Sequence, residues 1–320
     1  MRMNARRLAG VALACGMILG TTGTASAAAE LKLLLATSGT AKPATKQVLW
    51  EDVVKPNLEQ YSNGRIEVEV QGKGSLCSEV SCVEQLRLGQ IDITSISSGN
   101  VGAFGTTFDI INLPYLFKDS DSANRILRGW LAEELKKRSV AEMGFHTLAL
   151  VPVGGFRNIV TTDVPVRTPK DLAGVKIRTT KSPTEFSLIK AWGAAPIPYA
   201  WASLYEGLQA GVVKGMYLQD AFTASSKFYE VAGHVTRTGG AWSAHAVLMD
   251  EKRYQKLPDW AREAIDRVGA DLEAKAFEVD EAWINGVIQE MDGKIESYSP
   301  TPEEMKAWHQ GAVAAWVAVK

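Results

Sequence analysis

From residue 31 onward, short apolar segments alternate with amphipathic segments that carry helix-start signals, and this alternation constrains the fold more than any other feature. An apolar period of two predicts a strand, whereas a period near 3.6 predicts a helix. In the first half we expect strands at residues 31–36, 65–70 and 91–96, with helices ending near residue 61 and spanning residues 79–88. Strands and helices that alternate in this way are typical of an α/β protein.

The second half continues the pattern. A strand around residues 145–151 is followed by a predicted loop, residues 152–157, which contains two adjacent glycines. A strand at residues 175–178 lies between two capped helices, one starting at Thr168 and one at Ser182, where Ser182 and Glu185 form a predicted capping box. One long or kinked helix is expected from Trp260 to about Glu296, and Thr301 caps another.

The N-terminus has the features of an export signal. Three arginines (Arg2, Arg6 and Arg7) precede an apolar run from Leu8 to Gly20, and small residues follow up to Ala27. This predicts a signal peptide over residues 1–27 and a periplasmic location. The run is shorter than the ~20 residues that span a bilayer, so no direct membrane insertion is expected. Lipidation at Cys15 is an alternative, although the residues before it fit a lipobox poorly.

The length of the chain indicates how many lobes to expect, and its charge indicates which classes of partner to expect. Removal of 27 signal residues from the 320 leaves 293, more than one typical domain of about 100–150 residues. We therefore expect two lobes: residues 28–150 with about 241–260, and residues 151–240 with about 261–320. Of the 35 basic residues three lie in the signal peptide, so 32 remain against 36 acidic ones. This balance gives no reason to expect nucleic acid as a partner.

Cys77 and Cys82 are the two cysteines of the mature chain, and an oxidising compartment favours their pairing. If Ser78 caps a helix that begins at Glu79, Cys77 precedes the cap and Cys82 is the fourth helical residue. A hydrophobic staple brings these two positions into contact. Redox and zinc motifs require C-x-x-C, whereas this spacing is C-x4-C with no nearby histidine. We predict a disulfide, with two free buried thiols as the alternative.

No catalytic motif stands out. The four histidines, His146, His234, His245 and His309, are scattered without metal-ligand spacing, and the sequence has no G-x-S-x-G, H-E-x-x-H or complete phosphate-binding loop. No carboxylate pair suggests an acid and base couple. The sequence therefore predicts no enzyme, no cofactor and no metal site.

Several segments together resemble one family. They include GSLCSEVSCVEQLRLGQIDI from Gly74, RTPKDLAGVKIRT from Arg167 and AWASLYEGLQAGVVKG from Ala200, with shorter matches at residues 64–68, 113–119, 155–161 and 225–239. In these segments the chain is similar to the solute-binding receptors of tripartite ATP-independent periplasmic (TRAP) transporters, of the dicarboxylate-receptor type. The resemblance covers nearly the whole mature chain in order.

The resemblance implies a two-lobed periplasmic binding protein of the Venus-flytrap kind, with crossing hinge strands and a long bracing C-terminal helix. It also implies that a small organic acid binds between the lobes and is delivered to sodium-coupled integral membrane subunits. In that family the arginine of the K-I-R strand, here Arg178, usually holds a ligand carboxylate. Arg157 of the G-F-R segment commonly helps, and Trp201 typically lines the pocket.

The residues themselves agree with the first of these assignments, because a planar guanidinium presents two parallel donors that match a carboxylate. Alternatives stay open: Arg178 could make an internal salt bridge or close an exposed strand end, Arg157 could be scaffolding, and Trp201 could be core. Loops at strand ends of α/β sheets often bind ligands. The weaker candidates chosen on that ground are Thr37, Ser38, Thr40, Ser97 and Ser98.

The chain departs from the family pattern after Gly215. Leu218 stands where the family often has an asparagine that would bind a hydroxylated acid, and Tyr217 stands where a carboxamide or carboxylate is common. These changes favour a ligand with an apolar or aromatic body. Two other functions remain: a ligand-sensing periplasmic subunit for a signalling partner, and a periplasmic enzyme that acts on a small acid.

Overall fold

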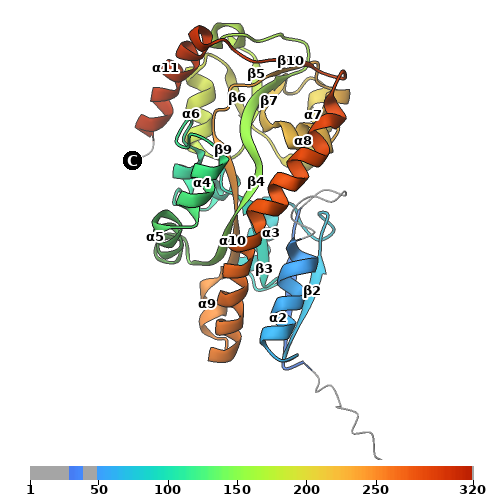
Figure 1. Ribbon diagram of the computed structural model, residues 1–320, viewed down its shortest axis with the longest axis vertical. Helices are drawn as coiled ribbons and strands as arrows, with labels where there is room; N and C mark the ends of the chain where they lie inside the picture. Colours follow the sequence, from blue (N-terminus) through green and yellow to red (C-terminus); the bar gives the residue numbers. More distant parts are fainter. Residues whose placement is uncertain (1–28, 39–48, 319–320) are drawn as a thin grey trace, which may run out of the picture.

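One mixed sheet runs through both lobes of the computed structural model, which describes residues 29–38 and 49–318. The strand order is β2-β1-β3-β9-β4-β7-β5-β6, with β8 and β10 attached beside β4. The predicted signal peptide, Cys15 and Thr40 lie outside the described residues. Figure 1 shows β4 and α10 both running from the lower lobe into the upper one.

The first lobe is built on the N-terminal strands. Strands β2 (Ile66–Gln71), β1 (Leu31–Ala36) and β3 (Ile93–Ser97) are parallel, and β9 (Trp242–Asp250) pairs antiparallel with β3 and β4. Two apolar clusters cover its two faces. Its helices are α2 (Lys55–Tyr61), α3 (Glu79–Arg87), α4 (Ser120–Leu127), α5 (Trp130–Arg138) and α9 (Glu251–Gln255).

The second lobe contains β7 (Gly215–Gln219), β5 (Lys176–Thr179) and β6 (Ala195–Pro198), with β8 (His234–Thr236) and β10 (Glu296–Tyr298) on the other side of β4. Its helices are α6 (Pro183–Ala191), α7 (Leu204–Gln209), α8 (Asp220–Ser225) and α11 (Pro302–Ala318). Helix α11 packs on α6, where Trp192 donates to the carbonyl of Trp308. The helix predicted after Thr168 is only a short 3₁₀ turn, Pro169–Leu172.

Strand β4 (Phe145–Thr161) connects the lobes. Its first part pairs with β9 as far as Phe156, and its last part, from Arg157, pairs with β7. The predicted loop at residues 152–157 is therefore wrong. The register shifts there, and Gly154 and Gly155 adopt φ of 74° and 77°. The two glycines make a bulge that bends a continuous strand, since they take left-handed conformations at little cost.

Helix α10 (Asp259–Val287) braces both lobes, as expected. Its buried apolar residues between Ala261 and Ala276 belong to an apolar cluster of the first lobe, whereas Val287 packs against an apolar cluster of the second lobe. The helix ends earlier than predicted, because a 3₁₀ turn, Ile288–Met291, follows. The exact lobe boundaries stay a prediction.

The disulfide prediction is confirmed. Cys77 and Cys82 are bonded, with 5.1 Å between their α-carbons. Helix α3 begins at Glu79, with Ser78 as N-cap in a capping box with Ser81. Both cysteines are buried, so the bond closes the turn that leads into α3 and fixes where Glu79 starts the helix.

Candidate ligand-binding site

Arg178 is the residue before the last in β5, between the parallel strands β6 and β7. It is only 2% exposed. Its Nε donates to the carbonyl of Tyr199 at 3.1 Å. Within residues 29–38 and 49–318, its two terminal nitrogens make no hydrogen bond. The guanidinium carbon lies 5.9 Å from the ring centroid of Trp201. The planar end of Arg178 is therefore buried, beside an aromatic ring, with its donors unused.

Arg157 follows the β4 bulge and is also buried. Its Nη1 donates to the carbonyl of Tyr217 at 3.1 Å, and its guanidinium carbon lies 5.9 Å from the Tyr217 ring centroid. Its Nε lies 3.3 Å from Oε1 of Glu185. Unlike Arg178, Arg157 has a charged partner inside the protein.

Glu185 is completely buried at the start of α6. Its other carboxylate oxygen accepts from the backbone N–H of Thr180 at 3.0 Å. A helix N-terminus favours a negative charge, which explains why a carboxylate is tolerated there. Ser182 caps α6 by accepting from the Glu185 N–H, but the predicted capping box is incomplete, because the Glu185 carboxylate binds Thr180 and Arg157 instead.

At Gly99 the first lobe lies directly against Thr180 and Glu185. It follows β3, and a β-carbon placed there would overlap Oγ1 of Thr180 and lie 2.9 Å from Oε1 of Glu185. Only glycine fits without displacing its neighbours. The end of β3 and the start of α6 are therefore in direct contact across the two lobes.

A second carboxylate, that of Glu79 at the start of α3, is partly buried and lies against the end of β3. Its Oε1 accepts from the Ser97 N–H at 3.0 Å and lies 3.5 Å from Nε2 of His245. Its Oε2 accepts from the Ser97 hydroxyl at 3.3 Å and from the side-chain amide of Asn100. Both oxygens of Glu79 are thus occupied by groups of the protein.

These charges interact. Burial and, next, the like charge of Arg157 lower the pKa of Arg178, Glu185 and Glu79 act in the opposite direction, and the net result is a pKa of about 10. Arg178 still carries its charge at neutral pH. We refer to Arg157, Arg178, Glu185 and Glu79 as the charged cluster.

Some of the predicted pocket residues lie near the charged cluster, and others make their contacts elsewhere. Trp201 is half-buried near Arg178, with Phe222 and Phe228 ring centroids each at 5.5 Å, and Ser97 contacts Glu79. The hydroxyl of Ser98 instead donates to Asn112 at 2.7 Å, and Thr37 is buried and bonded through its backbone to residues 71 and 74. Ser38, next to Thr37, is partly exposed.

Tyr217 and Leu218 are both buried in β7 and belong to different apolar clusters. The Tyr217 hydroxyl accepts from the Ala241 N–H at 2.6 Å, and burial raises the pKa of Tyr217. Leu218 shares its cluster with Phe228, against which Trp201 packs. Trp201 therefore supplies apolar surface near Arg178, and Leu218 lies two residues along β7 from Met216, which pairs with Arg178.

Sequence reasoning missed Glu79, Glu185, Asn100 and His245. Glu185 had a signal, its place in a capping box, but that pattern gave it a structural role only. The other three come together from separate segments, and His245 on β9 is 166 positions from Glu79 in the chain. No local pattern connects them.

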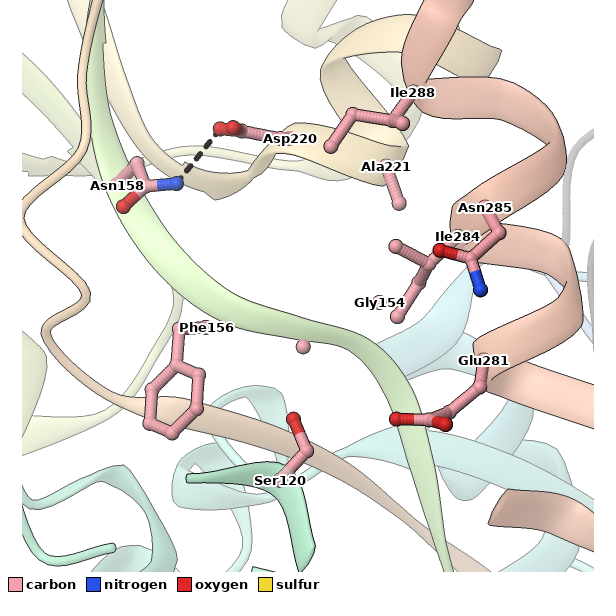
Figure 2. Close-up of a pocket in the computed structure, with 11 residues that line it drawn as sticks. Ser120, Gly154, Phe156, Asn158, Asp220, Ala221, Glu281, Ile284, Asn285 and Ile288 are labelled. Carbon is pink, nitrogen blue, oxygen red and sulfur yellow. Dashed lines mark hydrogen bonds between the residues drawn. The ribbon is translucent and has the colours of Figure 1, made fainter. Parts of the chain in front are cut away.

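A pocket of ≈ 260 Å³ lies elsewhere, between β4, α8 and α10. Figure 2 shows Asn158 of β4 directed toward Asp220 of α8, with Ile284 and Asn285 of α10 and Ile288 of the following 3₁₀ turn on the opposite side of the pocket. Asn158 and Arg157 are adjacent in β4, so their side chains leave opposite faces of the strand. The pocket therefore lies on the face of β4 opposite to the Arg157 side chain.

In the described part of the chain, no group of three histidine, cysteine or acidic residues is arranged to hold a metal ion. Among the same residues, no helix has the length and apolar character needed to cross a membrane.

Two α/β lobes joined by a crossing strand and a bracing helix, with buried arginines where the lobes meet, define a solute-binding protein. The model of the bacterial extracellular solute-binding proteins, family 7, matches residues 38–319, and the chain belongs to this family. Family members are TRAP periplasmic receptors.

Individual relatives agree with this assignment. A solute-binding protein of Verminephrobacter eiseniae is 31% identical, with 88% of this chain and 83% of that protein covered. The C4-dicarboxylate-binding periplasmic protein of Rhodobacter capsulatus is 27% identical, with coverage of 79% and 76%. The sugar acid binding protein of Advenella mimigardefordensis, solved with galactonate, has the same fold, with a TM-score of 0.84 at 21% identity and coverage of 92% and 94%.

Proposed function

We propose that this protein is a periplasmic receptor that binds a small organic acid through Arg178 and delivers it to the membrane subunits of a sodium-coupled TRAP transporter. The observation that carries the proposal is the buried guanidinium of Arg178, whose terminal nitrogens have no hydrogen-bond partner among the described residues. An unpaired buried charge is costly, and an incoming carboxylate would offset that cost with two parallel hydrogen bonds.

The surroundings support an acid with an apolar body. Trp201 lies near Arg178 and Leu218 lies in the adjacent strand β7, and neither offers a partner for several hydroxyl groups. A hydroxyl buried without a hydrogen bond costs about 1–3 kcal/mol, so a sugar acid is disfavoured. We therefore propose a short-chain, branched or aromatic acid as the ligand.

Transport, rather than catalysis, fits the family and the site. The family is made up of solute-binding proteins, and the charged cluster contains no group that we assign to a chemical step. Closure of the lobes around β4 and α10 would bury the ligand and create the surface that the membrane subunits recognise. Export to the periplasm would follow from the predicted signal peptide.

A melting-shift screen tests this function. Mature protein is unfolded and refolded to remove any co-purified ligand, then heated with short-chain, branched, aromatic and sugar acids, and with the amide of each acid. At a hundred times its Kd, a ligand stabilises by about 2.7 kcal/mol, which raises the melting temperature by several degrees.

We expect at least one apolar acid to stabilise the wild type but not Arg178→Ala, and its amide to have no effect. Arg237→Ala is the matched control, because Arg237 lies in the same lobe but pairs with Asp220. Equal stabilisation by the amides, or a retained response in Arg178→Ala, would contradict the proposal.

A further inference from the structure

Within residues 29–38 and 49–318, two places near Arg178 where a second ligand carboxylate could bind already hold a carboxylate of the protein. We propose that the site accepts acids with one carboxylate and discriminates against dicarboxylates, and that Glu185 is the residue that sets this limit. The inference rests on the proposed function and concerns the class of acid, which membership of the family leaves open.

The first place is Arg157. Its Nε faces Glu185 at 3.3 Å and its Nη1 donates to the Tyr217 carbonyl. Glu185 is fully buried, and its second oxygen is fixed by the Thr180 N–H, so the carboxylate is held where it is. Neither Arg157 Nε nor Glu185 Oε1 has an aligned hydrogen bond, which leaves charge as the basis of the pairing. A ligand carboxylate that approached Arg157 would meet Glu185 directly.

The second place is the end of β3, where the Ser97 N–H, the Ser97 hydroxyl and the Asn100 amide converge. Such a group of donors is suited to a carboxylate. All three already donate to Glu79. A second ligand carboxylate there would have to displace the partly buried Glu79 side chain or lie beside it unpaired.

The charge balance gives the same result. The two arginines of the charged cluster are matched by two carboxylates. Glu185 lies against Arg157, and both Glu185 and Glu79 act to raise the pKa of Arg178. One ligand carboxylate adds one negative charge, opposite the free end of Arg178. A second one adds another, with no unpaired arginine in the cluster to receive it, and like charges in a water-poor site repel strongly.

Calorimetry with matched acids tests the inference. The probes are pairs that differ by one carboxylate: butyrate and succinate, 2-hydroxybutyrate and malate, 3-phenylpropanoate and phenylsuccinate. For the pair that binds, we expect the wild type to favour the monocarboxylate by about tenfold or more in Kd, which corresponds to about 1.4 kcal/mol. A dicarboxylate that binds as tightly as its partner would overturn the inference.

Glu185→Gln tests the assigned residue, because glutamine keeps the shape and the acceptor for Thr180 but removes the charge. We expect the preference for the monocarboxylate to fall by about tenfold. The control is Glu303→Gln, which makes the same charge change on the exposed surface of α11. An unchanged preference in Glu185→Gln would show that Glu185 does not set the limit.

The two proposals fail in different ways. If no acid of either kind binds to the wild type, the proposed function is wrong. If acids bind but the dicarboxylates bind equally well or better, only the inference is wrong. Should Glu185→Gln fail to fold, the wild-type ratio alone still decides whether the site discriminates.

Discussion

The two faces of β4 differ in chemistry where the strand passes between the lobes. On the face toward α10, Asp280 accepts from the Gly154 N–H at 2.8 and 3.0 Å, and Asn158 donates to Asp220, which also pairs with Arg237. On the other face, Arg157 is paired with Glu185 of the charged cluster. One face holds the strand in place, and the other contacts the charged cluster.

The difference shows how one strand serves two purposes. A bulge with two glycines bends β4, and the buried Asp280 carboxylate fixes that bend from α10. Because both β4 and α10 connect the lobes, this contact lies where the lobes can move. Arg157 follows directly after the bulge, so the bend and the charged cluster are connected through a few residues of the same strand.

The largest effect is expected on the face of β4 that contacts the charged cluster. Arg157→Met leaves the Glu185 carboxylate buried without its partner, which should cost about 4 kcal/mol of unfolding free energy. Arg237→Met, on the other face, removes a partly exposed ion pair and should cost less than about 1 kcal/mol. Urea unfolding of ligand-free protein measures both. Equal losses would mean that the two faces do not differ as described.

The disulfide comes next, because it fixes the start of α3 and hence the position of Glu79 in the charged cluster. Replacing Cys77 and Cys82 with alanine should lower the free energy of unfolding by about 2 kcal/mol, as expected for so short a loop. It should also weaken binding of the acid found in the screen. Reduced wild-type protein is the control and should behave like the double variant. Unchanged stability would show that the bond is not needed to hold this turn.

A smaller effect is expected at the bulge. Gly154→Ala forces a β-carbon into a left-handed conformation, at about 1–2 kcal/mol, and places it 3.3 Å from Phe222. Gly64→Ala is a matched control, because its φ is 75° but nothing lies within 4 Å. We expect Gly154→Ala to lose more stability than Gly64→Ala and also to change ligand affinity. A loss of stability no larger than that of Gly64→Ala would contradict the role given to the bulge.

Much of the fold could be predicted from local signals. The strand and helix alternation, the start of α3 at Glu79 and the cap at Ser182 all depend on neighbouring residues, and so does the pairing of Cys77 with Cys82. The continuous β4 could not, because two adjacent glycines usually mark a loop. Only pairing with β9 and β7, both distant in sequence, makes that segment a strand.

The site shows the same division. The position of Arg178 at a strand end followed from its local sequence, and family resemblance gave it a role. The carboxylates of Glu185 and Glu79 were missed, because a charge is recognised as part of a site only when its partner is known. Glu185 meets Arg157 and Glu79 meets His245 through tertiary packing, which leaves no local trace in the sequence.

The central claim is that Arg178 holds the ligand carboxylate, and titration calorimetry of folded Arg178 variants with the acid found in the screen tests it most directly. Arg178→Ala should weaken binding by about 2–5 kcal/mol, as loss of a buried charged partner does. Arg178→Lys keeps the charge but loses the planar fork, so it should fall between the wild type and alanine. An Arg178→Ala affinity within about threefold of the wild type, less than 1 kcal/mol, would contradict the account and place the ligand elsewhere.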